Sequence, residues 1–187
     1  MAKVYTRIGD KGETSLVSGT RTEKSSDRIK LYGEVDELNS VIGLLISHLN
    51  NDIDKFGDQL DILRQVQNNL FNLGSRLACE SGQWEKYKLP ELHSSLTSIL
   101  EEGIDKMDNE LDYLTSFILP GGAIAASQAH VSRCVCRRVE RFLVGFSQLD
   151  QLPGNSIQFI NRLSDYLFVL ARFINKKMDK NEEYWKN

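Results

Sequence analysis

The sequence lacks several features that define common protein classes. No apolar run approaches the ~20 residues that span a bilayer, and Met1–Tyr5 lacks the apolar core of a signal peptide. The three cysteines are odd in number and lack zinc-ligand spacing: Cys79, Cys134 and Cys136. The three histidines are scattered, which favours structural or surface roles: His48, His93 and His130. These absences predict a protein of the reducing cytoplasm, with neither a membrane span nor a metal cluster.

The residues that are present indicate a single globular domain. A chain of 187 residues can bury a substantial core, and contents of 41% hydrophobic and 26% charged residues are ordinary. The net charge of −3 and the pI near 5.7 argue against a general nucleic-acid binder. We expect one domain over 1–187, with an arm at 1–26, helices over 27–177 and a polar tail at 178–187.

From residue 27 onward, apolar residues recur at helical spacing. The first set is Leu31, Val35, Leu38, Ile42, Leu45 and Leu49. Asp27 is placed to cap that helix. Further helices are expected over 60–77, 92–114 with a potential break at Gly103, 123–149 and 160–176. Pro120-Gly121-Gly122 and Pro153-Gly154 separate the last ones, so about five long helices joined by short loops predict an antiparallel all-α bundle with an amino-terminal arm.

The helix expected over 123–149 carries an arginine row, which we define as Arg133, Arg137 and Arg141. These residues fall at i, i+4 and i+8, with Glu140 beside them, and like charges at that spacing repel. An apolar stripe is expected on the opposite side: Val131, Val135, Phe142, Phe146 and Leu149. The row is either a solvated basic face or a docking surface for a polyphosphate, because guanidinium groups suit phosphate oxygens.

The arm has a different composition from the rest of the chain. Two short β-prone segments, 4–6 and 14–17, flank the turn signal Gly9-Asp10-Lys11-Gly12. The segment is either a plain hairpin or irregular arm, or a phosphate cradle. The features that suit a cradle are glycines, lysines and hydroxyls: Gly9, Gly12 and Gly19, Lys11 and Lys24, and Thr6, Thr14 and Ser15. The spacing of a Walker A loop is absent.

Two polar clusters interrupt the helical pattern. Asp36 lies in Tyr32–Asn39, away from the leucine stripe, and is either an exposed acidic residue near a helix start or a partner of an arginine in the row. Asn161 lies in Asn161–Tyr166 and either faces water or holds a specific partner, because asparagine is a poor residue inside a helix.

Four segments together resemble the PduO-type ATP:cob(I)alamin adenosyltransferases. They are Tyr5–Thr14, Tyr32–Asn39, Phe117–Gly122 with the arginine helix, and Asn161–Leu167. Their order and separations match across nearly the whole chain. One position departs from the family pattern, because Ile8 stands where threonine is usual.

The resemblance implies a five-helix bundle of the ferritin-like, cobalamin adenosyltransferase-like kind, with an irregular nucleotide-binding arm. It implies a homotrimer with active sites between subunits. The implied reaction transfers the 5′-deoxyadenosyl group of ATP to the cobalt of cob(I)alamin, giving adenosylcobalamin and triphosphate, with Mg²⁺ held through the ATP phosphates. A cob(II)alamin reductase and an adenosylcobalamin-dependent enzyme are implied partners. The alternatives are a non-catalytic ATP- or corrinoid-binding chaperone or sensor, and a purely structural oligomerisation module.

The resemblance also implies roles for single residues. The ATP-binding residues would be Thr6, Arg7, Gly9, Lys11, Gly12, Thr14, Ser15 and Lys24 of the arm, with Arg137, Glu140, Arg141 and Asn161 of the next subunit. Arg137 would stabilise the leaving triphosphate, and Arg133 would form a salt bridge with Asp36. Phe117 would line the cobalamin pocket and keep the lower ligand off cobalt. Cob(I)alamin is itself a strong nucleophile, so the lack of a Ser–His–Asp or Cys–His constellation is expected.

Overall fold

The computed structural model describes residue 5, residue 7 and residues 9–186. The helices are α1 (Asp27–Leu49), α2 (Ile53–Leu77), α3 (Leu96–Asp108), α4 (Ile124–Phe146) and α5 (Ser156–Lys177). A short 3-10 helix, Asn50–Asp52, joins α1 to α2. The strands β1 (Glu13–Ser15) and β2 (Arg21–Glu23) form a small antiparallel sheet. The predicted helical bundle is therefore confirmed.

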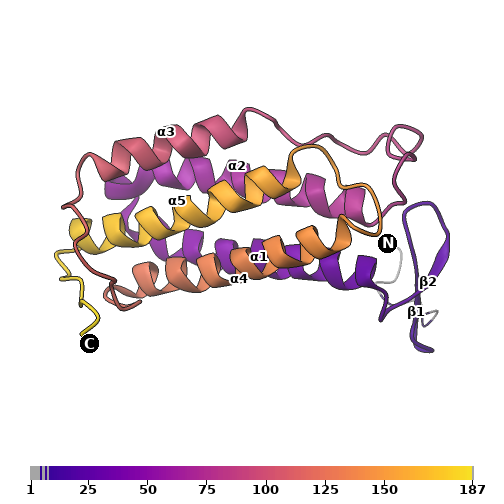
Figure 1. Cartoon of the computed structure of the whole chain (residues 1–187), viewed down its shortest axis with the longest axis horizontal. Coiled ribbons are helices and arrows are strands. Elements are labelled where there is room, and N and C mark those ends of the chain that lie inside the picture. The colour runs from indigo at the N-terminus through magenta and orange to yellow at the C-terminus, as the bar shows by residue number, and fades with distance from the viewer. Residues whose placement is uncertain (1–4, 6, 8, 187) are drawn as a thin grey trace.

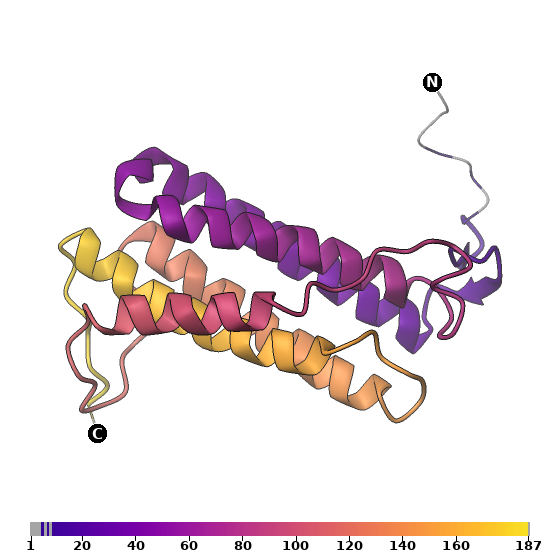
Figure 2. The same cartoon turned by 90° about the horizontal axis from the view of Figure 1, so that it is seen from above.

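The long helices lie side by side and alternate in direction along one axis (Figures 1 and 2). The helix α4 packs between α1 and α5, and α3 packs against α5. One end of the bundle carries the arm, and the opposite end carries the carboxy-terminal tail (Figure 2). None of the described helices is both long enough and apolar enough to cross a bilayer.

The buried face of α4 differs from the predicted stripe. Val131, Phe142 and Leu149 are exposed, whereas Val135 and Phe146 are buried as expected. The face that α4 buries includes several small residues: Ala125, Ala126, Ala129, Ser132 and Cys136. Because α4 has a helix on each side, it needs a wide buried face of small residues, so the stripe predicted from periodicity is only partly buried.

Several helix ends and one expected break also differ. The helix α3 covers only Leu96–Asp108 and runs unbroken through Gly103. A Cβ at Gly103 would lie 2.9 Å from Cε2 of Tyr166, so this glycine allows close packing rather than a break. The helix α2 begins before Leu60, at Ile53, with a kink at Phe56. The start of α1 is not capped as predicted, because the N-cap residue is Ser26 and no side chain caps it.

The arm forms a hairpin, and its strand β1 overlaps the predicted segment 14–17, whereas residues 4 and 6 of the other predicted segment fall outside the described residues. The partner of β1 is Arg21–Glu23, with Thr14 opposite Thr22, and Tyr5 is not in a strand. The backbone N–H of Val17 donates to the carbonyl of Ala78 at 2.9 Å, which joins the hairpin to the end of α2. The predicted polar tail is docked against the loop between α3 and α4. The Leu119 N–H donates to the Glu183 carbonyl at 2.7 Å, and the Trp185 N–H donates to the Phe117 carbonyl at 2.8 Å.

Candidate active site

The arginine row remains without carboxylate partners in the part of the chain that the structure describes. Arg137 and Arg141 are exposed, and Arg141 donates to the backbone carbonyl of Arg137 at 3.0 Å. Arg133 is half-buried, and its Nε is buried without a hydrogen-bond partner among the described residues. A buried guanidinium N–H without a partner is costly, so the site around Arg133 is suited to an incoming acceptor.

The neighbouring Arg138 has a role that the sequence did not reveal. Its Nε donates to the carboxylate of Glu34 at 2.5 Å, and its Nη2 forms an ion pair with the carboxylate of Glu37. These hydrogen bonds, first that to Glu37 and then that to Glu34, raise the pKa of Arg138. Both carboxylates lie on α1, so Arg138 fixes the rotation of α4 against α1. The spacing of Glu34 and Glu37, three residues apart on one helix, was the available signal.

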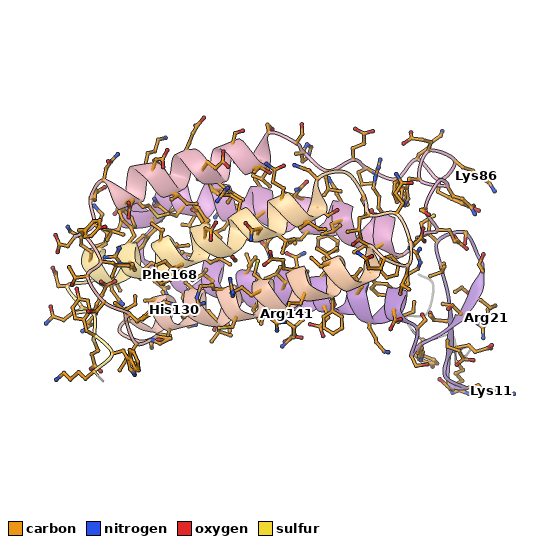
Figure 3. All side chains as sticks on the ribbon, viewed as in Figure 1. Lys11, Arg21, Lys86, His130, Arg141 and Phe168 are labelled. Carbon is orange, nitrogen blue, oxygen red and sulfur yellow. The ribbon has the colours of Figure 1, made fainter. Side chains whose placement is uncertain are left out.

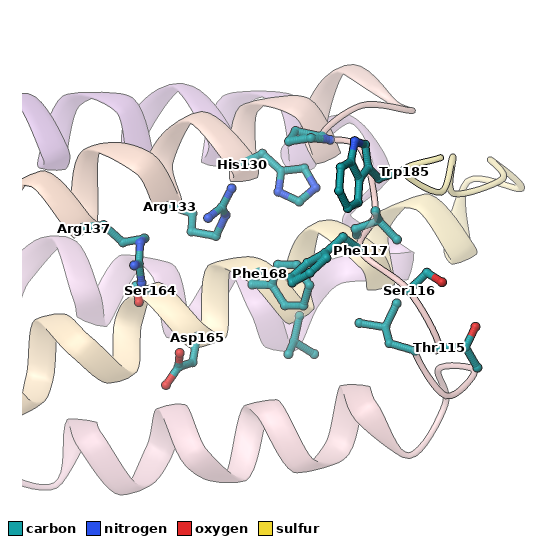
Figure 4. Close-up of a pocket in the computed structure, with 14 residues that line it drawn as sticks. Thr115, Ser116, Phe117, His130, Arg133, Arg137, Ser164, Asp165, Phe168 and Trp185 are labelled. Atoms are coloured by element: carbon teal, nitrogen blue, oxygen red, sulfur yellow. The ribbon is translucent and has the colours of Figure 1, made fainter. Parts of the chain in front are cut away.

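A cavity of about 960 Å³ opens beside the row, between α4, α5, the loop after α3 and the tail (Figure 4). Arg133 and Arg137 line one part of it, with Ser164 and Asp165 of α5 nearby. The other part is aromatic and apolar, with Phe117, Ile118, Phe168 and Trp185 among its walls. The cavity thus joins a cationic region to an apolar one, and it can hold a ligand that has both characters.

Phe117 lies at the mouth of this cavity on the loop between α3 and α4. Its side chain is 79% exposed, and its ring meets the ring of Trp185 edge-on, with centroids 6.4 Å apart. The tail that carries Trp185 is fixed by a buried ion pair between Arg172 and Glu182, at 2.9 Å. The backbone position of Phe117 is therefore set by the tail, which the sequence did not reveal.

His130 also lines the cavity, one turn before Arg133 on α4. Its ring meets the ring of Phe168 edge-on, with centroids 6.2 Å apart. Burial, and then the nearby charge of Arg133, lower the pKa of His130 to about 4. The imidazole is therefore neutral near pH 7. The sequence offered no reason to separate His130 from the other histidines.

Glu140 and Asn161 come together as one pair across α4 and α5. The Asn161 side-chain amide donates to Glu140 at 2.9 Å. Asn161 is exposed and also holds a specific partner, so it combines both of its predicted roles. Asp36 does not pair with Arg133 within the described part of the chain, and its side chain is exposed on α1.

The arm residues lie together at the end of the bundle where α1 begins. Gly12 adopts a φ of +86°, and the Lys24 N–H donates to its carbonyl at 2.8 Å. A Cβ at Gly9 would lie 3.2 Å from Nζ of Lys24, so the glycine lets this ammonium approach the turn. The rest of the predicted set lies on the same arm: Arg7, Lys11, Thr14, Ser15 and Gly19. Two predicted positions fall outside the described residues: Thr6, and Ile8, which stands where the family usually has threonine.

The arm and the arginine row are well separated within one chain. Figure 3 shows Lys11 and Arg21 at one end of the molecule, whereas Arg141 lies midway along the bundle and His130 lies beyond it. One chain therefore presents two halves of the predicted nucleotide site. Among the described residues, no group of three or more His, Cys, Asp or Glu side chains could hold a metal ion.

Comparisons with known proteins agree on one family. A family model described as cobalamin adenosyltransferase matches residues 4–174. The corrinoid adenosyltransferase of Bacillus subtilis is 41% identical over 175 residues, which cover 94% of this chain and 88% of the relative. The corrinoid adenosyltransferase MMAB of Homo sapiens is 38% identical, and the match covers 99% of this chain and 74% of the relative.

Solved structures give the same result. A variant PduO-type ATP:corrinoid adenosyltransferase from Lactobacillus reuteri, complexed with cobalamin and ATP, superposes with a TM-score of 0.91 at 35% identity. That match covers 99% of this chain and 100% of the other. A second variant from that organism, complexed with ATP, superposes with a TM-score of 0.87 at 34% identity, covering 98% of this chain and 100% of the other.

Proposed function

This chain belongs to the cobalamin adenosyltransferase family, and on that premise we propose that it transfers the 5′-deoxyadenosyl group of ATP to the cobalt of cob(I)alamin. The observation that carries the proposal is the cavity beside α4. Its cationic part, which includes Arg137, suits a polyphosphate, and its aromatic part, with Phe117 and Trp185, suits the apolar face of a corrinoid. The two parts meet, as a transfer between these two substrates requires.

The reaction needs positioning and charge stabilisation rather than a protein nucleophile. The lone pair of Co(I) attacks C5′ of ATP, a Co–C bond forms, the C5′–O bond breaks, and triphosphate leaves with the bond electrons. Arg137 is exposed beside the cavity and has no carboxylate partner among the described residues, so it can stabilise the leaving triphosphate. Lys11, Lys24 and the turn amides of the arm would hold the rest of the phosphate chain. Mg²⁺ would enter with ATP, bound through phosphate oxygens.

We propose that the nucleotide site is completed between copies of the chain in a homotrimer. The distance between the arm and the arginine row within one chain supports this arrangement (Figure 3). Two further features support it: Asp36 is exposed on α1, and the Nε of Arg133 is buried without a partner among the described residues. Asp36 of one copy would then accept from Arg133 of another. Exposed apolar side chains on α4, such as Ile124 and Val131, would be covered by the neighbouring copy.

Phe117 would act on the corrinoid side of the site. An aromatic ring at the lower face of the corrin excludes the lower ligand from cobalt, and this makes reduction of Co(II) easier. Its exposed ring on a tied loop suits this role. We also propose that α1–α5 form the five-helix, ferritin-like arrangement implied by the resemblance, and that the protein works in the cytoplasm. A cob(II)alamin reductase would supply its reduced substrate, and an adenosylcobalamin-dependent enzyme would use its product.

The proposal is tested by mixing the purified protein with cob(I)alamin, ATP and Mg²⁺ under a strong reductant. Formation of the Co–C bond is followed by absorbance, and release of triphosphate by ion chromatography. We expect one triphosphate for each adenosylcobalamin. Tight binding of both substrates without turnover would instead identify a chaperone or sensor. No affinity for either substrate would leave only a structural oligomerisation module.

A further inference from the structure

His130 has a hydrogen-bonding capacity that the folded chain does not use. Its side chain is 3% exposed, yet neither Nδ1 nor Nε2 has a hydrogen-bond partner among the described residues. Buried polar groups are rarely left in this state, because losing water without a new partner costs free energy. The ring lines the cavity, pointing into the space between Arg133 and Trp185 (Figure 4). A ligand that fills the cavity would therefore reach it.

The surroundings of His130 limit what that ligand group can be. The ring lies against Phe168, and the charged neighbour that acts on it is Arg133. A neutral imidazole has one N–H donor and one nitrogen acceptor. An uncharged group that can both donate and accept matches it, whereas a phosphate would be attracted to the guanidinium groups instead.

The geometry points to a corrinoid carboxamide as the partner of His130. We propose that one ring nitrogen of His130 hydrogen-bonds a peripheral carboxamide of the corrin ring and so fixes how the ring sits in the cavity. This inference rests on the proposed function, because it takes the aromatic part of the cavity as the corrinoid site. It makes His130 a residue for corrinoid recognition and not a cobalt ligand. An imidazole bound to cobalt would restore the lower ligand that Phe117 is proposed to exclude.

The test compares His130→Leu with His130→Asn and His130→Gln in the full-length protein. Leucine fills the space without polar groups, whereas the two amides keep a donor and an acceptor. We expect His130→Leu to raise KM for cob(I)alamin about tenfold, the loss expected for one buried hydrogen bond. The KM for ATP should stay within about twofold, and at least one of the two amide variants should recover most of the corrinoid affinity. His93→Leu, at an exposed histidine outside the cavity, is the matched control.

Cobinamide separates the ring from the lower nucleotide, because it keeps the ring carboxamides and lacks the nucleotide tail. The penalty of His130→Leu should be the same with cobinamide as with cobalamin. A penalty only with cobalamin would overturn the inference, since His130 would then contact the tail. Nitrogen superhyperfine splitting from the protein in the EPR spectrum of bound cob(II)alamin would overturn it in favour of cobalt ligation.

Three further outcomes are decisive. An unchanged corrinoid KM in a folded His130→Leu protein would show that the imidazole is only a structural residue. If His130→Leu does not fold, His130→Ala and the two amide variants still decide, because alanine removes the hydrogen bond and each amide keeps a donor and an acceptor. A raised corrinoid KM in His130→Ala that at least one amide variant restores supports the contact, and an unchanged corrinoid KM in His130→Ala rejects it. Absence of turnover in the wild-type protein would instead reject the proposed function.

Discussion

Arg28 joins three segments at the end of the bundle that carries the arm, and replacing it tests whether that junction positions the arm. Its guanidinium donates to the carbonyls of Leu77 at 2.9 Å and of Cys79 at 2.7 Å, and it forms an ion pair with Asp150. The arm is attached between those two carbonyls, where Val17 donates to Ala78. Arg28→Met keeps most of the side-chain volume and removes every one of these polar contacts.

The size of the effect follows from burial. The Arg28 and Asp150 side chains are 13% and 31% exposed, so the pair is neither fully buried nor freely solvated. Breaking a fully buried pair costs about 3–5 kcal/mol, and an exposed pair is worth about 0–1 kcal/mol. Two backbone carbonyls also lose a charged donor. We expect Arg28→Met to lower the free energy of unfolding by roughly 2–4 kcal/mol, or roughly 5–15 °C in Tm.

The assay combines urea unfolding, monitored by circular dichroism, with kinetics at low temperature where the variant remains folded. Because the junction holds the arm, KM for ATP should rise more than KM for cob(I)alamin. The matched control is Arg64→Met, since the ion pair of Arg64 with Asp61 is exposed and local, and should cost less than about 0.5 kcal/mol. A double-mutant cycle with Asp150→Asn should show a coupling of about 1 kcal/mol or more. Additive losses, or equal changes in the two KM values, would refute the reasoning.

Four further changes test the site and the packing. Arg137→Ala should reduce turnover at least ~10²-fold with an unchanged circular dichroism spectrum, because a charge-stabilising donor is lost; unaltered turnover would count against a role for the arginine row. Asp36→Ala and Arg133→Ala should be coupled in a double-mutant cycle of trimer stability, and independent effects would reject their salt bridge. Phe117→Ala should slow adenosylation that starts from cob(II)alamin more than it weakens ATP binding, and equal losses would reject a cobalt-side role. Gly103→Ala should destabilise the fold by about 1–3 kcal/mol, because the new methyl meets a tyrosine ring at 2.9 Å, and an unchanged urea midpoint would show that the ring can move.

The helical bundle could be predicted because its signal is local. Residues such as Leu38, Ile42 and Leu45 repeat at helical spacing on one face, and all three are fully buried. Helix α4 was harder, since it packs against helices on both sides and buries small residues that carry little periodic signal. Its exposed Val131 and Phe142 were assigned to the core because periodicity shows which residues share a face, and not which face is covered.

Contacts between segments that lie far apart in the sequence could not be predicted from residue spacing. Nothing local distinguishes Arg137, which has no carboxylate partner among the described residues, from Arg138, which has two. The difference arises from the rotation of α4 against α1. The pairing of β1 with Arg21–Glu23, and of the tail with the loop at Phe117, likewise depends on where the chain returns in space. The resemblance was enough to name the candidate residues. It did not reveal that the arm and the arginine row lie far apart within one chain.

The lack of carboxylate partners for the arginine row, among the described residues, is a consequence of its position in the fold. The other arginines of the helices each have at least one carboxylate partner: Arg28, Arg64, Arg76, Arg138, Arg162 and Arg172. In a chain of net charge −3, carboxylates are not in short supply. Arg133 and Arg137 nevertheless face a cavity whose wall includes Asp165, and neither pairs with that carboxylate in the described structure. Asp165 instead pairs with Arg162, at 2.7 Å. Because this nearby carboxylate is engaged elsewhere, Arg137 stays available to an anion, which suits its proposed role beside the triphosphate of ATP.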